Sequence, residues 1–124
     1  MELLPIVKYL ESPSHKQRFD TITQVLDSWG IPFDIHLYKT GKNIIAYPAG
    51  NKPVVGVSSH FDVVPGSPGA NDNGSSIAVC LGILKKLQAH VFKNIAIAVF
   101  FFDEEETGLK GSQAYVTEHK PINI

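Results

Sequence analysis

The chain contains a single cysteine, Cys80, among its 124 residues. One cysteine cannot form a disulfide within the chain, so a disulfide framework is excluded and a reducing compartment is expected. Cys80 lies in the apolar stretch IAVCLGIL. We therefore expect it to be a small core residue rather than a nucleophile.

Long apolar runs and an excess charge of one sign are also lacking. No apolar stretch reaches the ~20 residues that span a bilayer, and the N-terminus, MELLPIVKYLESPS, has no secretory-signal pattern. The 11 basic residues nearly balance the 12 acidic ones. We therefore expect a cytoplasmic protein whose partners include neither nucleic acid nor membrane.

Apolar periodicity predicts an α/β fold. Helices are expected over about residues 3–10, from the N-cap Ser14 to Gly30, over about 75–89 and over 110–118. FDIHLYK and IIAYP flank the turn TGKN and predict a hairpin. The runs VVGVSS and NIAIAVFFF predict two further strands, each covered on both faces.

The order strand, helix, strand, helix predicts a mostly parallel, mixed sheet with flanking helices. We expect one domain over residues 1–124. The last four residues, PINI, resemble the opening of another strand. The domain is therefore expected to be partial, truncated at its C-terminal end.

Polar clusters follow each predicted parallel strand. His60 and Asp62 come directly after VVGVSS, Asp72 precedes the following helix, and the acids of residues 103–106 come after AVFFF. Ligands of open parallel sheets bind beyond the carboxyl ends of the strands, where these side chains should converge.

Each cluster has a simpler explanation when taken alone. His60 can be a hydrogen-bonded histidine at a strand end, Asp72 can cap the following helix, and four consecutive acids can form a solvated loop. Together, one histidine and several carboxylates suit a zinc-type site. A further carboxylate there can act as general base toward metal-bound water.

Two long segments carry a family resemblance. SSHFDVVPGSPGANDNGSSIAVCLGILKKL and AVFFFDEEETGLKGSQAY resemble the catalytic core of zinc-dependent exopeptidases of the M28/M20 type, closest to the M28 aminopeptidases. The resemblance spans roughly residues 53–115 and implies a phosphorylase/hydrolase-like zinc exopeptidase fold.

The resemblance implies a role for each residue that matches the family motif. His60 and Glu106 would each bind one of up to two zinc ions, and Asp72 would bridge them. Asp62 would orient His60. Glu105 would be the general base, because TGLKGS fixes the register of the acidic run.

The resemblance implies further features around these residues. Asp103 and Glu104 would have no direct role, and the Asp72–Asn73 peptide would be cis. Two further metal ligands of the family have no counterpart in this chain. His90 and His119 sit in no ligand motif, and His119 is expected at the surface. Metal occupancy would therefore be reduced, and enzyme activity of this chain is left open.

Three functions follow from these observations. The first is metal-dependent hydrolysis of a peptide or small amide near a free terminus, with the water activated by Glu105. The second is a truncated, non-catalytic module that binds metal or forms a homo-oligomer. The third keeps the fold but changes the reaction to zinc-dependent acyl transfer or cyclisation, as in a glutaminyl cyclase.

Overall fold

The computed structural model describes residues 2–11, 14–47 and 52–119. Helices and strands follow one another along the chain in the order that the sequence predicts. The elements are α1 (Leu4–Leu10), α2 (His15–Ser28), β1 (Phe33–Leu37), β2 (Lys42–Ala46), β3 (Val54–His60), the π-helical turn η1 (Ala70–Ser75), α3 (Ser76–Leu87), β4 (Ala96–Phe102) and α4 (Lys110–Glu118).

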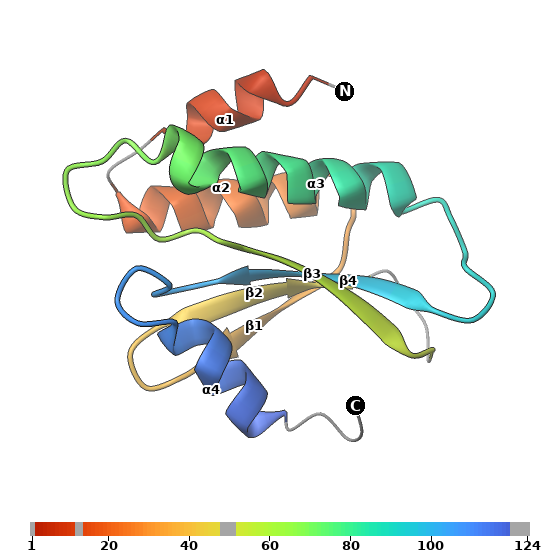
Figure 1. Cartoon of the computed structure of the whole chain (residues 1–124). Coiled ribbons are helices and arrows are strands. Elements are labelled where there is room, and N and C mark those ends of the chain that lie inside the picture. Colours follow the sequence, from red (N-terminus) through yellow and green to blue (C-terminus); the bar gives the residue numbers. More distant parts are fainter. Residues whose placement is uncertain (1, 12–13, 48–51, 120–124) are drawn as a thin grey trace.

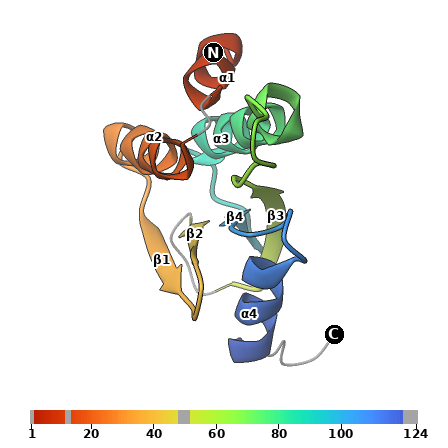
Figure 2. The same ribbon diagram turned by 90° about the vertical axis from the view of Figure 1, so that its left-hand side faces the viewer.

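The elements form layers around one four-stranded sheet with the order β1-β2-β4-β3. Figures 1 and 2 show α1, α2 and α3 together on one face of the sheet and α4 on the other. The buried apolar side chains of α1, α2, α3 and the sheet form a single core cluster. The C-terminal ends of β3 and β4 lie at the same edge of the sheet, next to the start of α3 (Figure 1).

Helix α2 begins and ends at residues suited to those positions. The Ser14 side chain accepts a hydrogen bond from the Gln17 backbone N–H at 3.3 Å, which caps the first turn. At the other end Gly30 has φ +67° and donates its N–H to the Asp27 carbonyl at 3.0 Å. Glycine adopts this left-handed conformation without a steric penalty, so the helix stops there.

The buried face of α2 contains a charged residue. Its fully buried side chains are Arg18, Ile22 and Leu26, which are spaced four residues apart and lie on one stripe of the helix. The apolar periodicity predicted the helix correctly, but it gave no indication that the first position of the stripe holds a guanidinium.

The predicted hairpin and mixed sheet are confirmed. Strands β1 and β2 are antiparallel, with Phe33 opposite Ala46 and Leu37 opposite Lys42. Strands β3 and β4 are parallel, and α3 provides the crossover between them. Strand β4 also pairs with β2 antiparallel, so only one of the three pairings in the described sheet is parallel. The expectation of a mostly parallel sheet is therefore wrong, because the hairpin joins the sheet through β2 beside β4.

The burial expected for β3 is wrong. In the described sheet β3 pairs only with β4, which makes it an edge strand, and Val54 and Val55 are 53% and 46% exposed. Strand β4 lies between two neighbours, and its buried side chains are Ala98, Val99 and Phe101, whereas the others are only half-buried. An apolar β-branched run is therefore compatible with an edge position.

Cys80 lies in the core as predicted, and burial raises the pKa of its thiol to about 11. Among the described residues no helix is both long enough and apolar enough to cross a bilayer. The strand predicted to open at PINI lies outside the described residues.

Candidate metal centre

His60 is the last residue of β3, and its ring is held by Asp62. The Nδ1 atom lies 3.3 Å from the Asp62 carboxylate and 3.2 Å from the Asp62 carbonyl oxygen. One intervening residue, Phe61, places both side chains on the same side of the extended chain. Nδ1 therefore donates to Asp62, and Nε2 is the atom directed toward the remaining carboxylates.

The Asp62 carboxylate also connects the two strand ends. It accepts the backbone N–H of Glu105 on one oxygen and that of Glu106 on the other, each at 3.0 Å. Burial by itself would raise the pKa of Asp62, but the bonds from His60 and from these two N–H groups lower it below its usual value. Asp62 therefore fixes the loop after β4 against the end of β3.

Asp72 lies in η1, between β3 and α3. Its carboxylate is 3.1 Å from Nε2 of His60, and its peptide bond to Asn73 is cis, as the family resemblance implied. The helix caps beside it are Gly69 and Ser75, so the alternative role of Asp72 as an N-cap is not what the structure shows.

His60, Asp72 and Glu106 form a group with ligand geometry. One potential ligand atom from each lies within 4.8 Å of the others. The Oε1 atom of Glu106 is buried and has no hydrogen-bond partner among the described residues. Burial and the neighbouring Asp72 carboxyl raise the pKa of Glu106. An unpaired buried carboxylate oxygen beside a second acid and an imidazole fits a divalent cation, which would bind all three.

Glu105 lies beside this group. Its carboxylate is 3.7 Å from Nε2 of His60, and 39% of its side chain is exposed. Burial by itself would lower the pKa of His60, but the bond to Asp62 and the charges of Asp62 and Glu105 raise it above its usual value. Glu105 therefore faces the centre from the solvent side.

The first two acids of the run point elsewhere. Asp103 is 1% exposed and accepts hydrogen bonds from His15 Nε2 at 2.7 Å and from the Lys42 N–H at 3.1 Å. Glu104 contacts the Thr40 hydroxyl and lies 3.6 Å from the Lys110 ammonium. Neither joins the ligand group, and Asp103 instead anchors the acidic loop to α2 and β2.

Arg18, which was not predicted as part of the site, contacts the backbone beside it. Its guanidinium donates to the Phe61 carbonyl at 2.5 Å and to the Gly69 carbonyl at 3.3 Å. The sequence did contain an indication that Arg18 is buried, because Arg18 precedes Ile22 and Leu26 at four-residue spacing on the apolar stripe of α2.

A second group of possible ligands lies at the far end of α4. His36, Glu118 and His119 have ligand atoms within 4.8 Å of one another. The Asn43 amide is fixed by the Asp103 N–H and the Gly111 carbonyl, so its Nδ2 donates to Nδ1 of His36 at 3.0 Å. Nε2 of His36 then carries the proton and donates to Glu118 at 2.6 Å. This tautomer leaves His36 no lone pair for a metal, so we assign the group as a hydrogen-bond network.

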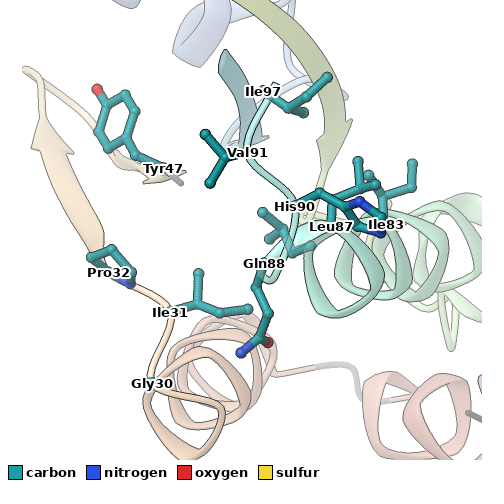
Figure 3. Close-up of a pocket in the computed structure, with 11 residues that line it drawn as sticks. Gly30, Ile31, Pro32, Tyr47, Ile83, Leu87, Gln88, His90, Val91 and Ile97 are labelled. Carbon is teal, nitrogen blue, oxygen red and sulfur yellow. The ribbon is translucent and has the colours of Figure 1, made fainter. Parts of the chain in front are cut away.

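The apolar cavity drawn in Figure 3 is not part of the candidate centre. It has a volume of about 320 Å³ and lies between the end of α3 and the segment that follows α2, with Ile31, Leu87 and Val91 among its lining residues. Ile97, near the start of β4, also lines it, whereas the candidate centre lies at the end of that strand.

The fold matches that of a zinc aminopeptidase over part of its length. The zinc aminopeptidase BSAP from Bacillus subtilis is 40% identical, with a TM-score of 0.58 over 62% of this chain and 20% of that one. The sequence profile of peptidase family M28 matches residues 43–124. The chain therefore belongs to peptidase family M28.

Curated relatives agree with this assignment. Aminopeptidase YwaD of Bacillus subtilis is 46% identical over 63 residues, which is 51% of this chain and 14% of the relative. The probable leucine aminopeptidase 2 of Aspergillus oryzae is 41% identical over 81 residues, 64% of this chain and 16% of the relative. The chain thus spans about a sixth or less of the length of these relatives.

A solved structure with lower identity matches more of the chain. The glutaminyl cyclase of Porphyromonas gingivalis has a TM-score of 0.78 over 98% of this chain and 53% of its own, at 21% identity. At that identity the similarity concerns the fold. It shows that α1, α2 and the hairpin belong to the same architecture as the segment that the family profile matches.

Proposed function

We propose that this chain provides the metal-binding and proton-transferring part of an aminopeptidase that hydrolyses peptide bonds near a free N-terminus. His60, Asp72 and Glu106 would hold zinc. The observation that carries the proposal is the convergence of these three side chains on one point, where the buried Oε1 atom of Glu106 has no partner among the described residues. Membership of family M28 supports a peptide as the substrate.

The metal would polarise the substrate carbonyl and lower the pKa of water next to it. Glu105 would take the proton from the attacking water. Its carboxylate lies next to the ligand group without belonging to it, and its side chain is partly exposed to solvent. Asp62 would keep His60 in the tautomer that leaves Nε2 free. The same carboxylate would hold Glu105 and Glu106 at their places through their backbone N–H groups.

The test uses Glu105→Gln with Glu104→Gln as the matched control. Both changes remove one carboxylate from the same loop, but Glu104 faces Thr40 and Lys110 instead of the centre. Zinc content and turnover of aminoacyl p-nitroanilides are measured for each. We expect Glu105→Gln to bind zinc like the unchanged protein and to lose turnover by about 100-fold or more, with Glu104→Gln close to normal.

Equal turnover in the two variants would contradict the role of Glu105. Zinc binding without any turnover, even in the unchanged protein, would favour the non-catalytic module instead. Turnover of N-terminal glutamine peptides without turnover of leucyl substrates would indicate the cyclase reaction.

A further inference from the structure

Arg18 is a positively charged residue in the protein interior, and its guanidinium donates hydrogen bonds to backbone carbonyls. The residue is 0% exposed. Its Nε donates to the Phe61 carbonyl at 2.5 Å, and its Nη1 donates to the Gly69 carbonyl at 3.3 Å and to the Leu10 carbonyl. In the part of the chain that the structure describes, none of these partners is a carboxylate.

Two of the three carbonyls that Arg18 contacts, those of Phe61 and Gly69, lie close in sequence to His60 and Asp72 of the candidate centre. Phe61 stands between His60 and Asp62, directly after β3. Gly69 is the N-cap of η1, three residues before Asp72, and its carbonyl also accepts the Gly74 N–H at 2.8 Å. One planar group with several donors therefore fixes the loop that carries Asp72 against the end of the strand that carries His60.

The local packing leaves room for the guanidinium at this place. Gly69 has φ +66°, and a Cβ atom there would lie 2.3 Å from Val63 and 2.8 Å from Nη1 of Arg18. A side chain at position 69 would therefore displace the guanidinium or the loop.

Packing alone does not account for an arginine at this position. The stripe it shares with Ile22 and Leu26 is apolar, and a methionine would fill similar volume without burying a charge. Burial lowers the pKa of Arg18, and the charges of Asp62 and Asp72 oppose that effect. The buried charge is thus coupled to two acids of the centre.

We infer that Arg18 is a positioning residue, which sets the distance between His60 and Asp72 by binding the carbonyls of Phe61 and Gly69. The inference rests on the proposed function, because the distance matters when both side chains hold the same metal. It predicts that the fork of donors, and not only the volume or the charge, is required at position 18.

The test compares Arg18→Met and Arg18→Lys with Leu26→Ala, a control that damages the same buried stripe two turns away from the centre. Binding of Co²⁺ is titrated by its visible absorption under conditions where circular dichroism shows each variant folded. We expect Arg18→Met to weaken Co²⁺ binding by about 10- to 100-fold and to change the absorption bands, as removal of ligand-orienting groups does. Arg18→Lys keeps the charge but not the fork, so it should recover only part of the affinity. Leu26→Ala should bind Co²⁺ normally.

Unchanged affinity and absorption in folded Arg18→Met would overturn the inference. If Arg18→Met does not fold, Arg18→Lys decides in the same way. If the unchanged protein binds no Co²⁺, the proposed function fails, and amide hydrogen exchange decides the role of Arg18 separately. Faster exchange of the Gly74 and Phe61 amides in Arg18→Lys, with the β2 amides unchanged, would support the positioning role, and equal exchange would overturn it.

Discussion

Replacement of Asp62 by Asn tests whether one carboxylate holds the two strand ends together. The Asp62 side chain is 9% exposed and accepts two backbone N–H groups, from Glu105 and Glu106, on separate oxygens. Asparagine keeps one acceptor oxygen and places an NH₂ group against the other N–H. The change therefore leaves one buried donor without an acceptor and removes the charge from the remaining bond.

The magnitude follows from these contacts. A hydrogen bond to a charged group contributes roughly 1.5–3 kcal/mol, and a buried donor left unpaired costs about 1–3 kcal/mol. Because both figures describe overlapping losses, we expect Asp62→Asn to lower the free energy of unfolding by about 2–3 kcal/mol. For a domain of this size, the corresponding fall in Tm is roughly 10 °C.

Urea unfolding followed by circular dichroism measures the loss. Asp34→Asn is the matched control, because Asp34 is an exposed acid on β1. The control should stay within about 0.5 kcal/mol of the unchanged protein. A loss for Asp62→Asn no larger than that of the control would refute the reasoning that this carboxylate fixes the loop after β4.

Three further predictions concern the fold around the centre. Gly111→Ala should destabilise the protein by about 1–3 kcal/mol in urea unfolding, since its Cβ would lie 2.3 Å from the Asp103 carbonyl oxygen; a neutral effect would mean that α4 can shift freely. Leu81→Ala, at a fully buried site, should cost about 2–5 kcal/mol, whereas Leu37→Ala, at a site 71% exposed, should cost less than about 0.5 kcal/mol. The hydrogen bond to Asp103 raises the pKa of His15 in the folded protein. The stabilisation from this contact is therefore complete below the pKa of His15 in the unfolded chain, about 6.5, and is lost as the pH rises through the pKa in the folded protein. His15→Gln should therefore cost more at pH 5.5 than at pH 8, by less than about 1 kcal/mol because half of the side chain is exposed; a cost that does not change with pH would contradict this.

Local signals predicted most elements of the fold. The cap at Ser14, the left-handed glycine at Gly30 and the turn in TGKN are decided by a few neighbouring residues, so the chain itself contains the information. The helix predicted over residues 110–118 matches α4 as observed. The helix predicted over about residues 75–89 matches α3, which begins at Ser76, but the π-helical turn η1 over residues 70–75 was not predicted.

Burial of β3 depended on information that lies outside the strand. A run of β-branched residues indicates β propensity, but the number of neighbours of a strand is decided by the rest of the sheet. The exposed side chains of Val54 and Val55 show the difference. Arg18 was missed for a related reason, since an arginine is assigned to the surface unless its partners are known, and Phe61 and Gly69 are 43 and 51 residues away from it.

The candidate site was predictable at the level of which residues meet, because parallel strands bring their carboxyl ends to one edge. His60, Asp72 and Glu106 do lie together, and Asp62 does contact His60. Their roles as ligands and as an orienting acid are part of the proposal, and the zinc and cobalt titrations test them.

The acidic run shows why spacing alone could not assign all four acids. Strand β4 ends at Phe102, and Glu104 adopts φ +51°, so the chain turns sharply within the run. Asp103 is directed inward to His15, Glu104 is directed to Lys110, and the last two acids face the centre. The turn thus directs the first two carboxylates away from the centre, whereas burial and the neighbouring Asp72 carboxyl raise the pKa of Glu106. A divalent cation at that point would relieve the repulsion between these two acids. The same turn that separates the charges therefore also produces the group that fits a metal.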